Sequence, residues 1–360
     1  MEERWLELYE KLVNTDTGFE VPIEEKLKRT QFIADILSDM GFEVKRGKAS
    51  HIATIGQPPY ITLIGHLDTV FSEDILKDWR FTAEGDVVKG PGVADMKGGI
   101  IVLLASLKEF LKEAKNVPIA VVLNVDEEIG SPMGKEDHYK MAEKSSFCLS
   151  FETGRKDMGI VMSRKGIATM NIVVYGKAGH ASLPKHGANA LIEMAYKVID
   201  VADLSKKYET MTITPTIATA GYKTNVIPDR AEVTFDIRYG ALEDIKKFRI
   251  DLEGIFLTPH IEGTEVSYSI EIKRPPMAAS PLAEKTAKNA MNKLNVDYPM
   301  LSVGGGGDAA FYSEKGVPAI DGLGIVGRHI HSKDEEAYLD TFEPRVRFVQ
   351  ELLTEITKNI

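Results

Sequence analysis

The sequence predicts an α/β protein in which a domain with a mainly parallel, mixed sheet is interrupted by an inserted ferredoxin-like α+β domain. In the first part of the chain, short apolar runs alternate with helical patterns, which is typical of a parallel sheet covered by helices. From about residue 166 the expected order becomes β-α-β-β-α-β, that of the ferredoxin-like split unit. A length of 360 residues is consistent with two domains.

The elements of the first part follow from apolar periodicity. Residues 23–40 show the spacing of one amphipathic helix, and residues 98–111 that of another. The runs 60–65, 117–125 and 147–151 are short, apolar and β-rich, so we expect them to be strands. Strands this apolar indicate a sheet that is buried on both faces.

The inserted segment has a different pattern. Its expected strands are 168–175, 211–220, 231–237 and 265–272, and its expected helices are 188–201 and 243–256. Pro275-Pro276 then interrupts the pattern, and a helix, a strand near 318–323 and a long C-terminal helix follow. We therefore assign residues 1–165 and 275–360 to one discontinuous domain and residues 166–274 to the insertion.

Composition excludes several classes of protein. The net charge of −10, without a basic block, makes nucleic acid or an anionic membrane an unsuitable partner. The single cysteine, Cys148, excludes an internal disulfide framework and a cysteine-rich zinc site, and we expect it in a buried strand. The charged N-terminus is no signal peptide, and no apolar run approaches ~18 residues, so we expect a cytoplasmic protein.

Polar residues gather where expected strands end, which is where open α/β sheets bind ligands. These clusters are His66-Leu67-Asp68, Asp126-Glu127-Glu128, Glu152 and His329-Ile330-His331, with Asp95 in a glycine-rich segment before the helix at Gly98. Histidines and carboxylates without cysteine indicate a divalent metal. Zinc is the first choice, with manganese or cobalt as alternatives.

Two local patterns suggest roles. Residues 66 and 68 lie on the same side of an extended segment, so Asp68 could accept the far ring N–H of His66 and fix its tautomer. Glu127 and Glu128 point to different sides, so one could bind metal while the other acts as a general base toward water.

Each pattern alone has a simpler explanation. His66-x-Asp68 could be a surface pair, Glu127-Glu128 a solvated face, and Asp95 a helix cap. Their common order and placement favour the metal site. The glycine-rich segments lack the Rossmann and P-loop spacings, which argues against nucleotide binding, and no Gly-x-Ser-x-Gly elbow is present.

In this order the motifs resemble the M20 family of metallopeptidases, and the nearest likeness is its glutamate carboxypeptidase (carboxypeptidase G2) branch. The motifs that carry the resemblance are His66-Leu67-Asp68-Thr69-Val70, Gly90 to Gly99, Asp126 to Ser131, Phe151-Glu152 and His331-Ser332. The likeness continues in Gly176 to Ala181, Asn225 to Pro228, Asp236 to Tyr239 and Gly304 to Ala309, so it covers nearly the whole chain.

The resemblance implies a zinc-peptidase-like catalytic domain with two Zn²⁺ ions per subunit. His66 and Glu152 would hold one ion, Glu128 and His331 the other, and Asp95 would bridge both. Asp68 would orient His66, and Glu127 would be the general base toward the bridging water. The Asp95-Met96 peptide bond would be cis. His329 is the alternative to His331, which the following Ser332-Lys333-Asp334-Glu335 context favours.

The resemblance also implies that the inserted domain is a lid and a homodimerisation surface. His180 would reach the partner subunit's site and stabilise the oxyanion, and Asn225 and Arg238 would bind substrate. Arg274 is a weaker match to an Arg-Pro element of the branch. Gly305 and Gly306, in the glycine run that ends at Asp308, would line the pocket for a substrate carboxylate.

The expected function is a zinc-dependent exopeptidase or amidohydrolase that releases a C-terminal amino acid, with glutamate as first choice, by means of metal-activated water. The alternative is deacylation of an N-acyl amino acid of the acetyl-lysine, acetyl-ornithine or succinyl-diaminopimelate type. A metal-free scaffold or binding protein is the alternative from another class, and the intact set of ligands and base argues against it. The sequence does not define the substrate side chain or acyl group.

Overall fold

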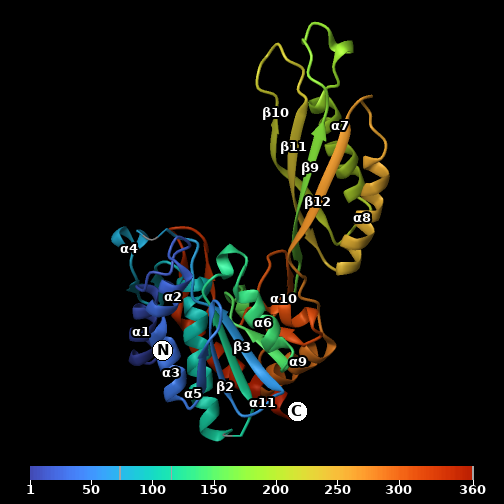
Figure 1. Cartoon of the computed structure of the whole chain (residues 1–360). Helices are drawn as coiled ribbons and strands as arrows, with labels where there is room; N and C mark the ends of the chain where they lie inside the picture. Colours follow the sequence, from blue (N-terminus) through green and yellow to red (C-terminus); the bar gives the residue numbers. More distant parts are fainter. Residues whose placement is uncertain (73, 115, 359–360) are drawn as a thin grey trace. The chain divides into compact units, whose positions relative to one another are not determined.

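The computed structural model describes residues 1–72, 74–114 and 116–358, and the chain divides into two compact units (Figure 1). The first unit comprises Met1–Arg164, Met277–Val303 and Gly307–Ile360. The second comprises Lys165–Pro276 together with Gly304–Gly306.

The first unit is an α/β layer structure around a mixed sheet. The sheet has the order β1-β2-β6-β3-β7-β14. Its strands are β1 (Glu43–Arg46), β2 (Ser50–Ile55), β3 (Tyr60–His66), β6 (Ile119–Asn124), β7 (Ser145–Ser150) and β14 (Ala319–Ile320). The strands β6, β3, β7 and β14 run parallel, whereas at one edge β2 pairs antiparallel with β6 and β1 pairs antiparallel with β2.

Helices cover both faces of this sheet. Those of the first unit are α1 (Glu3–Val13), α2 (Ile23–Arg29), α3 (Gln31–Asp39), α4 (Ile75–Asp78), α5 (Gly98–Glu113), α6 (Gly134–Ala142), α9 (Pro281–Leu294), α10 (Ala309–Glu314) and α11 (Phe342–Thr357). Along β3, Ile61 and Leu63 pack into the core with α5 and α11, while Ile64 packs with α10 on the other side. The predicted double-sided burial is therefore confirmed.

Smaller sheets complete the first unit. Strand β13 (Met300–Val303) pairs in parallel with β8 (Ile160–Arg164). A second small sheet has the order β15-β16-β5-β4. Its strands are β4 (Thr82–Glu84), β5 (Val87–Lys89), β15 (Gly327–Arg328) and β16 (Glu336–Tyr338).

The second unit has the element order β-α-β-β-α-β and one antiparallel sheet ordered β10-β11-β9-β12. Its elements are β9 (Gly166–Tyr175), α7 (Ala190–Ser205), β10 (Thr212–Ala220), β11 (Arg230–Tyr239), α8 (Leu242–Phe256) and β12 (Glu265–Arg274). Figure 1 shows α7 and α8 beside each other against this sheet. Alternate β9 residues such as Met170 and Ile172 are buried in its core.

Two expected elements differ from the structure. The helix expected over 23–40 is two helices, α2 and α3, because the chain leaves helical geometry at Thr30. The Thr30 hydroxyl donates to the carbonyl of Lys26 at 2.8 Å, a bond that bends helices. The strand expected near 318–323 is only the two-residue β14, because Asp321 turns to bond with Val161.

Among the described residues, no helix combines the length and the apolar character needed to cross a membrane.

The contact of α5 with the end of β7 gives a stability prediction. A Cβ atom on Gly99 would lie 2.0 Å from the carbonyl oxygen of Phe151, so Gly99→Ala should lower the free energy of unfolding by about 1–3 kcal/mol. The matched control is Gly254→Ala in α8, where a Cβ would meet no described atom within 4 Å; it should raise that free energy by roughly 0.5–1 kcal/mol. Urea unfolding followed by circular dichroism measures both, and equal effects would contradict this packing.

Candidate functional site

The parallel strands of the first unit deliver three polar segments to one edge of the sheet. His66 is the last residue of β3, Glu127 and Glu128 follow β6, and Glu152 follows β7. Strands β6, β3 and β7 are neighbours and run in the same direction, so their carboxyl ends meet.

Asp95 lies in a buried turn before α5. Gly92 has a φ of +77° in this turn, where a Cβ would lie 2.7 Å from Thr69 Cγ2, so the turn requires glycine. The Asp95-Met96 peptide bond is cis, as the family resemblance implied. Asp95 is 6% exposed.

The two carboxylate oxygens of Asp95 face two different imidazoles. Oδ1 is 3.4 Å from Nε2 of His66, and Oδ2 is 3.1 Å from Nε2 of His331. The same nitrogen of His331 is 3.4 Å from Oε2 of Glu128. Of the two histidines in the 329–331 segment, His331 is therefore the one whose ring contacts these carboxylates. The structure brings four predicted ligands together, with Asp95 between the histidines.

The donor set fits a divalent cation. One ligand atom each from His66, Asp95 and Glu128 lie within 4.8 Å of one another. In the part of the chain that the structure describes, Asp95 Oδ1 and Glu128 Oε1 are buried and receive no hydrogen bond. Buried carboxylate oxygens without donors are costly, and a metal ion held by imidazole and carboxylate ligands would satisfy them.

Asp68 connects His66 with the Glu127-Glu128 turn. The backbone carbonyl of Asp68 lies 3.1 Å from Nδ1 of His66, and Oδ1 of its fully buried side chain is 3.4 Å from the same nitrogen. The two carboxylate oxygens of Asp68 also accept the backbone N–H groups of Glu127 at 3.2 Å and Glu128 at 3.0 Å. Asp68 therefore lies where it can orient the imidazole of His66. It also holds the Glu127-Glu128 turn, a contact that the sequence analysis did not predict.

Glu152 lies beside a buried arginine that the sequence analysis did not consider. Oε2 of Glu152 is 4.0 Å from Nη2 of Arg164, and Nε of Arg164 contacts Oδ2 of Asp321 at 2.5 Å. Burial, with the nearby charge of Asp95, raises the pKa of Glu152 well above its ordinary value. A cation in this place would favour the ionised carboxylate.

The histidines and carboxylates shift each other's titration. Contacts with Asp95 and Glu128 raise the pKa of His331 to about 10. Burial alone would lower the pKa of His66, but Asp68 and Asp95 raise it well above its ordinary value. Burial alone would raise the pKa of Asp95, yet His331 and His66 hold it well below its usual range. Burial raises the pKa of Glu128.

His180 and Asn225 belong to the second unit, where two loops bring them close in space. The N–H of Ala181 donates to the carbonyl of Asn225 at 3.0 Å, and His180 forms an antiparallel bridge with Val226. Both predicted residues are exposed, and Nδ1 of His180 lies 2.7 Å from the hydroxyl of Ser182.

The other predicted substrate-binding residues also lie in the second unit. Arg238 on β11 holds Asp236 with two contacts, 2.9 Å from Nε and 3.1 Å from Nη2, so its guanidinium already binds a carboxylate of this chain. Arg274 is buried, and a Cβ on Gly306 would lie 3.1 Å from its Cδ. Gly306 therefore lets the backbone approach Arg274, and Gly305 precedes it in the same run.

The cluster of histidines and carboxylates on this α/β fold is suited to a divalent cation, and comparison with known proteins gives the family. The chain belongs to peptidase family M20/M25/M40, whose profile matches residues 62–355. It is therefore a hydrolase of the metallocarboxypeptidase and amidohydrolase class, as predicted.

Individual relatives agree with this assignment. Carboxypeptidase G2 of Pseudomonas sp. (strain RS-16) is 33% identical, over 92% of this chain and 83% of the relative. A succinyl-diaminopimelate desuccinylase of Magnetococcus marinus is 25% identical, over 88% of this chain and 90% of the relative. A Bacillus subtilis structure described as a dinuclear metal-binding peptidase of family M20 has a TM-score of 0.75 at 17% identity, covering 99% and 98% of the two chains.

The raised pKa of His331 predicts that metal uptake releases protons. At pH 7 the imidazolium must lose its proton before its nitrogen can bind a metal ion, so affinity should rise with pH until about pH 10. Calorimetric zinc titrations of metal-free protein, in buffers that differ in ionisation enthalpy, count the released protons. His331→Asn should reduce this count and His329→Asn should not, whereas an equal count in all three proteins would contradict the assignment.

Proposed function

We propose that this chain is a two-zinc exopeptidase that releases a C-terminal amino acid, preferentially glutamate, from a peptide or N-acyl amino acid. The observation that carries the proposal is Asp95, whose two carboxylate oxygens face His66 and His331 separately. A carboxylate placed in this way is suited to bridging two cations. The 33% identity with a carboxypeptidase G2 supports the choice of reaction.

The residues that would hold the two ions follow from this arrangement. His66 and Glu152 would bind one ion, Glu128 and His331 the other, and Asp95 both. Bound zinc supplies Lewis-acid polarisation of the substrate carbonyl and lowers the pKa of water. Cobalt or manganese would suit the same nitrogen and oxygen donors.

Glu127 is the proposed general base and acid. Asp68 accepts its backbone N–H and that of Glu128, so the turn that carries both side chains is held in place. Glu127 takes a proton from the attacking water on its carboxylate. It then donates this proton to the nitrogen of the leaving amino acid as the amide bond breaks.

The second unit is the proposed lid and dimerisation domain. We infer that His180 acts in the partner subunit's site, where it donates a hydrogen bond to the oxyanion that forms during attack, and that Asn225 binds substrate. Their exposure and their shared loop pair are compatible with such a role.

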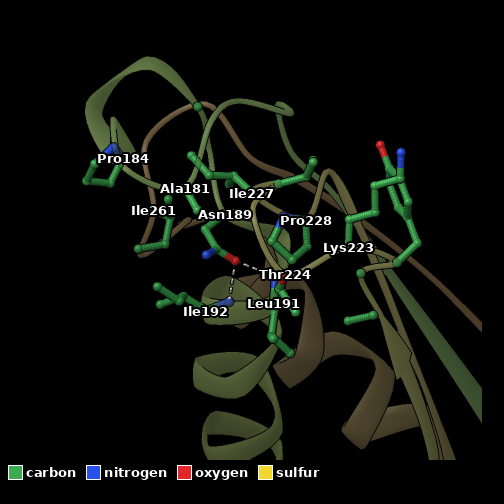
Figure 2. A pocket seen from close by; sticks show the side chains of 15 residues that line it. Ala181, Pro184, Asn189, Leu191, Ile192, Lys223, Thr224, Ile227, Pro228 and Ile261 are labelled. Carbon is green, nitrogen blue, oxygen red and sulfur yellow. Dashed lines mark hydrogen bonds between the residues drawn. The ribbon is translucent and has the colours of Figure 1, made fainter.

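Exposed apolar side chains on the second unit support the dimer. Ile217 lies on β10, an edge strand of the sheet, and is 62% exposed. Leu191 and Ile192 at the start of α7 are also exposed, and they line a hollow of about 770 Å³ with Ala181 and Ile227 (Figure 2). Exposed apolar surface beside an edge strand is typical of a protein interface.

The substrate preference rests on basic groups and on the relatives. Buried Arg274 beside Gly306 offers a cation and approachable backbone for the α-carboxylate of the leaving amino acid. The second candidate is deacylation of an N-acyl amino acid, and the 25% identity with a succinyl-diaminopimelate desuccinylase supports it.

A substrate panel separates these activities. Zinc-loaded protein should hydrolyse N-acyl-glutamates with a higher kcat/KM than N-acetyl-lysine, N-acetyl-ornithine or N-succinyl-diaminopimelate, measured by release of the free amine. The absence of glutamate release from every acyl-glutamate would eliminate the first choice. Preferential cleavage of a basic or succinylated substrate would establish the second.

The matched control for the panel is Glu127→Gln. This change keeps the shape of the side chain but removes the base, so kcat should fall about 10²- to 10⁴-fold. The zinc content, measured by elemental analysis, should stay at the wild-type value. Full activity in this variant would refute the role of Glu127.

Mixing two inactive variants tests whether His180 acts across the dimer. If it does, one site of each heterodimer between Glu127→Gln and His180→Ala subunits regains both groups. Statistical exchange should then restore about a quarter of the wild-type rate. Recovery should be absent if His180 serves its own subunit. The control for nonspecific recovery is the double variant Glu127→Gln/His180→Ala, which restores no complete site when it is mixed with either single variant.

A further inference from the structure

Glu335 is a buried carboxylate at the base of the loop that carries His331. It is 1% exposed and directly precedes β16. Strand β15 pairs antiparallel with β16, with Arg328 opposite Glu336, so residues 329–335 form the loop of a hairpin. Glu335 is therefore a buried acid in the same loop as His331, and it is not itself one of the predicted metal ligands.

The carboxylate of Glu335 receives three backbone N–H groups from the Asp95 turn. Oε1 accepts from Ala94 at 2.8 Å and from Asp95 at 3.0 Å, and Oε2 accepts from Gly92 at 3.2 Å. Both oxygens are therefore engaged with peptide groups. The role that follows is to hold the turn and not to bind a metal ion directly.

The hairpin loop connects Glu335 with His331 through its own hydrogen bonds. The N–H of Glu335 donates to the carbonyl of Ser332 at 3.1 Å. The Ser332 hydroxyl donates to the carbonyl of His329 at 2.7 Å and accepts the N–H of Asp334 at 3.2 Å. His331 lies between the bonded residues His329 and Ser332, so fixing Glu335 also restrains the backbone that carries the histidine.

We propose that Glu335 is a positioning residue that sets the separation of Asp95 and His331, and thereby the affinity of the site for metal ions. The inference rests on the proposed two-metal function. Glu335 is not one of the predicted ligands. Its role would be to hold segment 92–95, which carries Asp95, against segment 329–335, which carries His331. Outer groups of this kind typically change metal affinity 10- to 100-fold when they are replaced.

The chemistry explains why a carboxylate is needed at this position. Three N–H donors require acceptors on both terminal atoms, and only a carboxylate provides them. In Glu335→Gln the amide oxygen could serve Ala94 and Asp95, but the NH₂ group would then face the N–H of Gly92. A donor would oppose a donor, so the turn would shift away from the loop.

Glu336 provides a matched control one residue along the chain. Its carboxylate contacts Nε of Arg328 at 2.5 Å and the hydroxyl of Tyr338 at 2.6 Å, and these contacts do not involve the Asp95 turn. Glu336→Gln makes the same chemical change at the adjacent position and should leave metal binding at the wild-type value.

The test measures zinc affinity directly. Metal-free wild type, Glu335→Gln and Glu336→Gln are titrated with zinc against a chromophoric chelator, and thermal unfolding of each metal-free protein checks its folding. Glu335→Gln should weaken one or both zinc equivalents about 10- to 100-fold. Its kcat at subsaturating zinc should fall accordingly and recover with excess zinc, while KM stays unchanged.

The outcomes separate this inference from the proposed function. If Glu335→Gln binds both equivalents as tightly as wild type, or if Glu336→Gln weakens them equally, the positioning role is refuted. If wild type itself binds no zinc, the two-metal function fails instead. If Glu335→Gln does not fold, Glu335→Asp replaces it, because aspartate keeps the charge but has a shorter side chain. In the same titration Glu335→Asp must bind zinc more weakly than Glu336→Asp.

Discussion

The constraint on which the first unit depends is the burial of several carboxylates at one edge of its sheet. Asp95, Glu128 and Glu152 approach one another where water is largely excluded, and each would repel the others if ionised. Burying such charges is favourable only with compensating partners. His66 and His331 face the two oxygens of Asp95 and supply part of the compensation. A cation would satisfy Asp95 Oδ1 and Glu128 Oε1, which receive no hydrogen bond within the described part of the chain.

The surrounding loops are folded on other buried carboxylates that are not ligands themselves. Asp68 accepts the N–H groups of the Glu127-Glu128 turn, and Asp126 accepts those of Met133 and Gly134 farther along the same segment. The carboxylate of Asp308 accepts the Ser131 hydroxyl at 2.6 Å, which closes this segment from its other side. The backbone N–H donors to Asp68 and Asp126 and the Ser131 hydroxyl that donates to Asp308 stabilise these carboxylates and hold the loops in place.

The sequence was sufficient for the sheet and for the identity of the clustered side chains. Strands such as β3 and β6 are continuous apolar runs followed directly by polar residues, so both their burial and the polar cluster at their ends could be read from side-chain type. The helix over 23–40 was predicted wrongly as one element, because apolar spacing continues across Thr30 while a side-chain bond to Lys26 ends the first helix. Arg164 was missed, since its partner Asp321 lies 157 positions along the chain.

Hydrogen bonds made by backbone peptide groups could not be predicted from the periodicity or the motifs of the sequence. The donors to Glu335 are the N–H groups of Gly92, Ala94 and Asp95, and nearly every residue type carries such a group. In the sequence, an acid that binds backbone cannot be told from one that binds side chains, such as the neighbouring Glu336, which contacts Arg328 and Tyr338. Predicted ligands can be identified in a sequence from their side chains. The backbone groups that hold them, such as those of the Asp95 turn, can be identified only from the structure. The support of a metal site is therefore the part of its chemistry that a structure adds to the sequence.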